Sequence, residues 1–139
     1  MKKRYFSFIR IGRTMKLAAV VAMVLALINP LPAMAAPYGG QVISGQAAIA
    51  QSGSVTNINQ QTQKAAINWQ GFSIGAKETV NFNQPSAQSL TLNRVIGNEK
   101  SLINGALNAN GQVFLVNSNG VLFGKGASVN VKGLVASTL

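Results

Sequence analysis

The feature that most restricts the fold of this chain is a short-range alternation of apolar and polar residues after residue 35. Between residues 79 and 83, Val80 and Phe82 alternate with a threonine and two asparagines. Three further runs alternate in the same way: 65–69, 89–93 and 127–132. Successive side chains of a β-strand point to opposite faces, so a period of two gathers the apolar side chains of each run on one face. The pattern therefore predicts short β-strands that are apolar on one side.

Leu90 and Leu92 form the apolar set of the second of these runs, whereas residues 113–116 are apolar without interruption and predict a strand buried on both faces. Turn signals separate the runs, because Gly permits a positive φ and Pro fixes φ. The signals are Gln84-Pro85, Asn110-Gly111, Asn119-Gly120, Lys125-Gly126 and Lys132-Gly133. No long stretch after residue 35 repeats with a helical period, so we predict no helix. Residues 101–107 are the stretch for which the pattern is least clear.

The spacing of the runs restricts the architecture. The strand centres Ile67, Val80 and Leu92 lie 13 and 12 residues apart, which suits a sandwich, a barrel or a parallel β-helix. Residues 36–139 hold 13 Asn and 10 Gln, and stacked coils allow such amides to form ladders. We therefore predict an all-β parallel β-helix of about four or five coils, with about 20–25 residues per coil. An all-β sandwich remains the alternative.

The two ends of such a solenoid differ in the sequence. Residues 41–44 and 47–50 are predicted to fold over the first coil as an N-terminal β cap, because a solenoid end leaves backbone N–H and C=O groups unpaired. At the other end, the β-like stretch 134–139 contains no stop signal. We expect the solenoid to be incomplete at its C-terminus, with further sequence downstream.

The start of the chain has the composition of an export signal. Residues 1–16 carry six of the twelve basic residues and no acid, and residues 17–28 are an unbroken apolar run. This run has twelve residues, whereas a helix needs about 20 to cross a bilayer. A signal peptide therefore explains the segment better than a membrane anchor or an amphipathic surface helix does.

Small residues mark the expected cleavage point. Ala33-Met34-Ala35 places alanine at both positions that signal peptidase reads. We predict cleavage between Ala35 and Ala36, with the Sec machinery and signal peptidase as the processing partners. The chain then divides into an extended signal peptide at 1–35 and a functional segment at 36–139.

The net charge of +10 belongs mostly to the leader. Residues 36–139 hold six Lys or Arg and two Glu, which leaves a net charge of +4, and the six bases are scattered singly. Nucleic-acid binding needs clustered bases with aromatic side chains among them, so we predict no nucleic-acid partner. The chain contains no Cys, which excludes disulfides and the acylation site of a bacterial lipoprotein.

The functional segment lacks the side chains that most reactions require. It has no His, Cys or Asp, and its two acids, Glu78 and Glu99, stand 21 positions apart. Nucleophilic catalysis needs a base beside the hydroxyl, and metal sites need His, Cys or clustered carboxylates. A glycosidase pair would require both Glu to meet on adjacent coils, and Trp69 with Phe72 would suit either a sugar platform or the core. We predict no enzyme, no metal and no cofactor.

Several segments resemble a known family. They are 67–75, 93–97, 105–107, 110–124 and 129–138. Together they resemble the haemagglutination-activity domain of filamentous-haemagglutinin-like proteins, which is the two-partner secretion (TPS) domain of large Gram-negative exoproteins. The resemblance begins near Tyr38 and covers nearly all of the functional segment. It corresponds to about the first half of the family domain.

The resemblance implies a right-handed parallel β-helix. It also implies a partner: the polypeptide-transport-associated domains of an outer-membrane barrel transporter, which bind the domain in the periplasm on its way to the cell surface or the medium. The downstream effector of such a protein is an adhesin, a haemolysin or a contact-dependent toxin, commonly a virulence factor. The family's Asn-Pro-Asn-Gly motif falls on residues 117–120, with Ser118 in place of Pro. Loss of the Pro leaves the turn freer, at a cost of about 1 kcal/mol.

We expect the partner to pair with extended segments of the chain by strand addition. The predicted partner-binding residues are Asn117, Ser118, Asn119 and Gly120, followed by Asn93 and Arg94. Each of them is equally compatible with a purely structural role in a β-turn. Two alternatives remain open: a self-sufficient surface adhesin that binds host glycan or protein, and a non-functional truncated fragment.

Overall fold

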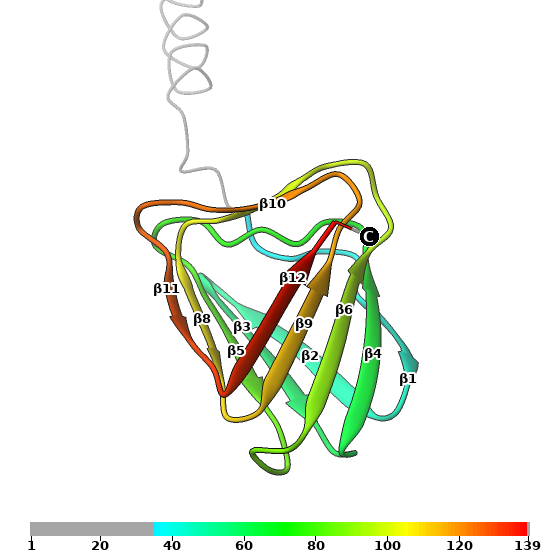
Figure 1. Cartoon of the computed structure of the whole chain (residues 1–139). Helices are drawn as coiled ribbons and strands as arrows, with labels where there is room; N and C mark the ends of the chain where they lie inside the picture. The colour runs from blue at the N-terminus through cyan, green and yellow to red at the C-terminus, as the bar shows by residue number, and fades with distance from the viewer. Residues whose placement is uncertain (1–34, 139) are drawn as a thin grey trace, which may run out of the picture. The chain divides into compact units, whose positions relative to one another are not determined.

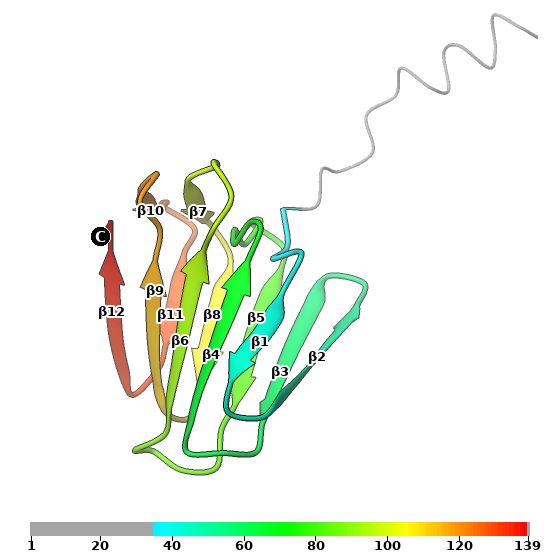
Figure 2. The same ribbon diagram turned by 90° about the vertical axis from the view of Figure 1, so that its right-hand side faces the viewer.

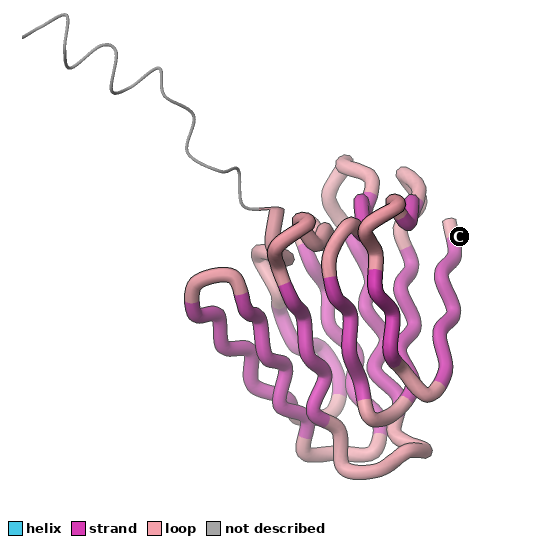
Figure 3. Tube along the Cα trace, turned by 90° about the vertical axis from the view of Figure 1, so that its left-hand side faces the viewer, coloured by secondary structure: helices cyan, strands magenta, loops and turns pink. Residues whose placement is uncertain are grey.

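The computed structural model describes residues 35–138, and every regular element in that range is a β-strand (Figure 3). Ala33 and the rest of the predicted leader up to residue 34 lie outside the described residues. The described range holds no helix that is long and apolar enough to cross a membrane. The all-β class predicted from the alternation is confirmed.

The strands of the described range are short and evenly distributed. They are β1 (Gln41–Ser44), β2 (Ala47–Ser52), β3 (Val55–Gln60), β4 (Lys64–Trp69), β5 (Thr79–Asn83), β6 (Leu90–Val95), β7 (Ser101–Ile103), β8 (Ala106–Ala109), β9 (Gln112–Val116), β10 (Val121–Phe123), β11 (Ser128–Asn130) and β12 (Gly133–Ser137). The stretch 101–107, which the sequence pattern left least clear, holds β7 and the start of β8.

Strands β3 to β12 wind into a parallel β-solenoid with three faces (Figures 1 and 2). One face is the sheet β1-β4-β6-β9-β12, the second is the sheet β11-β8-β5-β3-β2, and the third is the pair β10-β7. A bridge between Ile74 and Ile103 extends the third face. Neighbours within a face come from successive turns of the chain and pair in parallel. This pairing confirms the β-helix prediction and excludes the antiparallel sandwich.

The register gives the length of each turn. Thr79 pairs with Val55, 24 positions earlier, and Gly133 pairs with Gln112, 21 positions earlier. Across all parallel strand pairs, one turn takes between 20 and 27 residues. Equivalent positions of successive turns therefore stack directly, as Thr56, Val80, Leu107 and Val129 do on the second face.

The core fills the space between the faces. Trp69, Phe72 and Phe82 are at most 2% exposed and form an aromatic cluster. The rings of Trp69 and Phe72 meet edge to face with centroids 5.5 Å apart, and the rings of Phe72 and Phe82 stack at 6.4 Å. Each such side chain stabilises the fold by about 1.5–3 kcal/mol through burial. Trp69 and Phe72 are thus core residues, and the alternative of a sugar platform is wrong.

The predicted N-terminal cap is present. Strand β1 pairs antiparallel with β4, and β2 pairs antiparallel with β3, so the cap closes the first coil on two faces. A Cβ at Gly40 would lie 2.5 Å from the Trp69 ring, which shows how closely the cap backbone packs on the core. Strands β1 and β2 thereby pair with the edges of β4 and β3 that the first coil would otherwise leave open.

Strand β6 departs from the usual distribution of polar and apolar side chains. Its alternation is as predicted, but Thr91 and Asn93 point inward at 0% exposure while Leu90 and Leu92 face outward and are half-buried. The inward polar groups are paired: Gln84 Nε2 donates to Thr91 Oγ1 at 2.9 Å, and Thr91 Oγ1 donates to the amide oxygen of Gln60. Satisfied hydrogen bonds remove the cost of burying these polar groups.

Strand β9 corrects a second expectation. Val113 and Leu115 are 0% exposed, but Phe114 and Val116 are only half-buried, so the run 113–116 is buried on one face and not on both. Its outer side chains lie in register with Leu92, Arg94 and their neighbours on β6. The uninterrupted apolar run reflects an outer surface that is itself apolar.

Candidate functional site

The turn at residues 117–120 is tied to the preceding coil. The side chain of Asn117 is 0% exposed. Its Nδ2 donates to the backbone oxygen of Glu99 at 2.9 Å and to Ser101 Oγ at 3.0 Å. These acceptors belong to the loop before β7 and to β7 itself. One amide therefore joins two consecutive turns of the solenoid.

The other residues of the turn complete this arrangement. Asn117 Oδ1 accepts from the backbone N–H of Asn119 at 2.9 Å and from its Nδ2 at 3.1 Å. Asn119 Nδ2 also donates to the Gly97 oxygen at 2.8 Å. Gly120 has φ of 116°, a region that L side chains rarely adopt. The pattern Asn-x-Asn-Gly thus has a local structural cause at three of its four positions.

Ser118 is the exception. It is exposed, and its hydroxyl forms no hydrogen bond within residues 35–138. The Ser that replaces Pro therefore does not use its ability to bond the backbone. Ser118 and the exposed Asn119 are the members of the turn that a partner can touch on the folded surface.

Asn93 lies at the centre of the first face. Trp69 Nε1 donates to Asn93 Oδ1 at 2.9 Å, and Asn93 Nδ2 lies 3.3 Å from the Phe114 oxygen and 3.4 Å from the Thr91 oxygen. The amide connects β4, β6 and β9 in the interior. Because it is 0% exposed, no other molecule can reach it in the folded solenoid.

Arg94 follows Asn93 in the chain but points the other way. It is exposed, and its Nε lies 3.3 Å from Asn68 Oδ1 on the neighbouring strand. Beside it, apolar side chains of successive turns line the outer surface of the sheet. These outward residues are Leu90, Leu92, Phe114, Val116 and Val135. Apolar surface of this kind beside a cation is typical of interaction sites.

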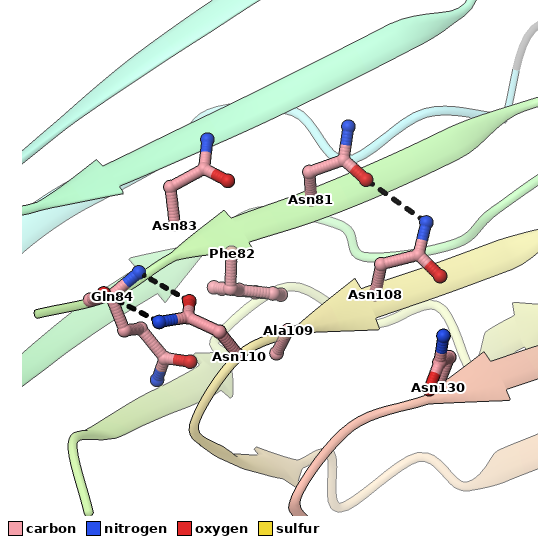
Figure 4. A pocket seen from close by; sticks show the side chains of 8 residues that line it. All are labelled: Asn81, Phe82, Asn83, Gln84, Asn108, Ala109, Asn110 and Asn130. Carbon is pink, nitrogen blue, oxygen red and sulfur yellow. Dashed lines mark hydrogen bonds between the residues drawn. The ribbon is translucent and has the colours of Figure 1, made fainter. Parts of the chain in front are cut away.

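The second face is covered by amides. Asn81 Nδ2 donates to Asn57 Oδ1, and Asn108 Nδ2 donates to Asn81 Oδ1, both at 3.0 Å, in the register that also places Asn130 next in line. The predicted amide ladder is therefore confirmed. Around it lies a hollow of about 430 Å³ (Figure 4), lined by Asn81, Phe82, Asn83, Gln84, Asn108, Ala109, Asn110 and Asn130.

The predicted site residues thus fall into two groups. Residues 117–120 form one turn, which contacts the loop after β6, and Asn93 and Arg94 lie side by side on β6 with opposite orientations. Sequence reasoning missed Ser101 as a partner of Asn117. Its only signal was a polar residue at the start of a short apolar run, which is too weak to identify a partner.

The structure also defines the surroundings of the two glutamates and of Ala36, which follows the predicted cleavage point. Glu99 accepts from the Tyr38 hydroxyl at 3.4 Å, whereas Glu78 accepts from the backbone N–H groups of Ala35 and Gly75. The two carboxylates therefore serve different partners. Within residues 35–138, no group of three or more His, Cys, Asp or Glu is placed to hold a metal ion. Ala36 is half-buried at the start of the described chain.

Comparison with known proteins decides the family. A family model described as "TPS secretion domain" matches residues 33–139. The chain belongs to this family. The TPS secretion domain is a targeting fold, and the family assigns residues 33–139 a role in secretion.

Similar proteins support this assignment. A heme/hemopexin-binding protein of Haemophilus influenzae (strain ATCC 51907 / DSM 11121 / KW20 / Rd) is 44% identical over 102 residues, which cover 73% of this chain and 11% of the relative. A second heme/hemopexin-binding protein of Haemophilus influenzae is 49% identical over 81 residues, covering 58% and 9%. The chain therefore spans about a tenth of the length of these curated relatives.

A solved structure shares the fold. The HMW1 secretion domain from Haemophilus influenzae superposes with a TM-score of 0.71 at 42% identity, covering 74% of this chain and 27% of that one. The parallel β-solenoid of this TPS domain is thus a fold seen in another secretion domain.

Proposed function

We propose that residues 36–139 address a larger exoprotein to a partner outer-membrane barrel, whose periplasmic polypeptide-transport-associated domains read the chain before it folds. The observation that carries this proposal is the complete enclosure of Asn93 and Asn117, both 0% exposed in the folded solenoid. If these residues belong to the signal, a partner reaches them only while the chain is extended. Secreted protein or protein held at the cell surface is the expected product.

Extended chain suits recognition by strand addition. Its backbone N–H and C=O groups are free, and alternate side chains enter pockets of the partner. In the solenoid the same groups are used internally: the Asn117 N–H, for example, donates to the Ser137 oxygen at 2.9 Å. Folding and partner binding therefore compete for the same backbone groups.

This competition gives export a direction. The buried aromatic cluster of Trp69, Phe72 and Phe82 stabilises the folded state by about 1.5–3 kcal/mol for each side chain. Each satisfied amide such as Asn93 adds about 1 kcal/mol. Once the segment folds outside the membrane, this stability opposes its return. The outward bias of export then requires no ATP.

The test compares binding of folded and unfolded chain to the purified periplasmic domains of the transporter. The full chain is offered either in native buffer or immediately after dilution from urea. We expect capture of the diluted chain and weak capture of the folded chain. Equal capture of both forms contradicts reading before folding, and secretion that persists without the transporter contradicts the partner role.

Processing is a separate part of the proposal. Export by the Sec machinery and cleavage between Ala35 and Ala36 would release the segment from its leader. N-terminal sequencing of the exported chain measures this directly, and a first residue other than Ala36 contradicts it. Ala33 substituted by a bulky residue should block the cleavage.

The hollow on the second face favours one alternative function. Amide side chains of Asn81, Asn108 and Asn130 offer donors and acceptors for the hydroxyl groups of a glycan. A surface adhesin that needs no partner would use such a surface. Binding of the folded chain to a glycan array, lost in Asn108→Ala and retained in Asn68→Ala on the first face, would support this function.

A further inference from the structure

Glu78 is a buried carboxylate with an incomplete set of partners. It lies in the turn before β5 at 7% exposure. Its Oε1 accepts from the Gly75 N–H at 2.7 Å, and the Glu78 N–H donates to the Gly75 oxygen at 2.9 Å, so one carboxylate oxygen closes the turn. Among residues 35–138, its Oε2 accepts from the Ala35 N–H alone, at 3.1 Å. An ionised carboxylate offers about four acceptor sites.

No cation of the described part of the chain accompanies this charge. Glu78 forms no ion pair within residues 35–138, and the neighbouring Lys77 is exposed. The strand that follows the turn is β5, and its parallel neighbours are β3 and β8. None of these three strands contains a charged residue. Buried charges in proteins are normally paired. The structure therefore leaves an anion in need of a positive partner.

The chain beside this anion is held in place. Pro37 is buried, and its oxygen accepts from Gln51 Nε2 at 2.5 Å. The next residue, Tyr38, exchanges backbone hydrogen bonds with the β4–β5 connection at Gly71, at 2.9 and 3.3 Å. Ala36 is thus the last residue before an anchored segment, and Ala35 touches Glu78. Consecutive Cα atoms lie about 3.8 Å apart, so the Ala36 nitrogen is one residue along the chain from the nitrogen that contacts the carboxylate.

We propose that Glu78 is the binding site for the α-ammonium group that signal-peptide cleavage creates on Ala36. Hydrolysis of the Ala35–Ala36 peptide bond consumes one water and leaves a carboxylate on Ala35 and an ammonium on Ala36. The Ala35 fragment departs with the leader, and the ammonium takes the place of the Ala35 N–H at Glu78 Oε2. The uncut chain can offer only a neutral amide there. The inference rests on the proposed cleavage site.

This ion pair has a defined pH dependence. It raises the pKa of the α-amino group above its ordinary value of about 7.7–8.0. The resulting stability is fully present below that ordinary pKa and is lost as the pH rises through the raised pKa of the folded state. The uncut chain has no such dependence, because its nitrogen at this position is an amide.

The experiment compares Glu78→Gln with Glu99→Gln in the exported full chain. Glu99 is the matched control, because it is the only other acid of the chain and is exposed. N-terminal sequencing first establishes the start at Ala36. We expect Glu78→Gln to lower the urea midpoint at pH 7 and to increase the rate of α-amine acetylation by acetic anhydride several-fold, with Glu99→Gln close to the wild type. In the uncut chain, obtained with Ala33→Tyr, Glu78→Gln should lower the urea midpoint less than it does in the cleaved chain.

Two results overturn the inference. One is equal acetylation rates and midpoints for the two variants in chains that start at Ala36, which leaves the proposed processing intact. The other is a start at a different residue, which refutes the proposed cleavage as well. If Glu78→Gln fails to fold, the pH dependence of acetylation in the wild type decides: an α-amino pKa at or below the ordinary value rejects the ion pair. Dependence of secretion on the transporter is measured separately and bears only on the proposed function.

Discussion

Trp69 Nε1 donates a hydrogen bond to Asn93 Oδ1 at 2.9 Å in the interior of the solenoid, and both residues are at most 1% exposed. This bond joins consecutive strands of the first face and satisfies the one polar atom of the largest core side chain. It makes an inward-pointing amide part of the core. The same amide lies within hydrogen-bonding distance of the Phe114 oxygen one turn further on.

Asn93→Leu should therefore destabilise the fold although it places an apolar residue in the core. The indole N–H would lose its acceptor, at a cost of about 1–3 kcal/mol. Urea unfolding followed by far-UV circular dichroism measures the loss in every variant, including those that lack Trp69. The double variant Trp69→Phe with Asn93→Leu should recover part of it, because neither polar partner remains. An additive double variant would show that the bond contributes nothing.

Asn117→Ala should cost about 2 kcal/mol, because its amide fills two donor and two acceptor contacts in a buried position. Ser118→Ala is the matched control in the adjacent position, and it should change the free energy of unfolding by less than about 0.5 kcal/mol. Denaturant midpoints of the two variants test the difference. Equal midpoints would mean that the bonds of Asn117 are replaced by water without loss.

Ser118→Pro should stabilise the folded domain by about 0.4–1 kcal/mol. Proline reduces the freedom of the unfolded chain, and the Ser118 N–H forms no hydrogen bond that would be lost within the described residues. Thermal unfolding of both chains gives the comparison. A lower melting temperature would mean that the backbone at Ser118 cannot accommodate the proline ring.

Gly120→Ala should destabilise the domain through backbone strain alone. The nearest heavy atom to the new Cβ is Lys100 Cβ at 3.9 Å, which is ordinary contact, but φ is 116°. Strain of this kind costs about 1–3 kcal/mol. Gly53→Ala is the control, because Gly53 has φ of 57° and open space around it, and it should cost less. Equal losses in the two variants would mean that a φ of 116° strains alanine no more than a φ of 57° does.

Because the leucines of β6 point outward, substitutions of leucine on β6 and β9 should differ in their effect on the free energy of unfolding. Leu92→Thr should cost less than about 1 kcal/mol, since its side chain lies on the outer surface, whereas Leu115→Ala should cost about 2–5 kcal/mol as a buried cavity. Leu92→Thr should also reduce any self-association of the folded domain, which sedimentation measures. A large loss of stability in Leu92→Thr would contradict the outward orientation.

The alternation of residue types was sufficient to predict strands at 65–69, 79–83, 89–93 and 127–132, and the amide content of stacked coils predicted the ladder. The N-terminal cap was predicted, but its antiparallel pairing was not. The strands and the ladder depend on neighbours in the chain or on identical residues one turn apart, such as Asn81 and Asn108. The turn at residues 117–120 could be located for the same reason, because Gly and Asn favour turns wherever they stand. The parallel topology was predicted from the strand spacing and the amide content as well as from the family resemblance, and the register confirmed it.

By itself, the sequence determined which residues share a face of each strand, since a period of two follows from strand geometry alone. Only the tertiary structure decided which face is inside. On β6 that choice depends on partners contributed from elsewhere in the chain: Gln60 and Gln84 for Thr91, and Trp69 for Asn93. The burial of Asn117 and of Glu78 was hidden for the same reason, because a buried polar group is defined by the distant groups that satisfy it.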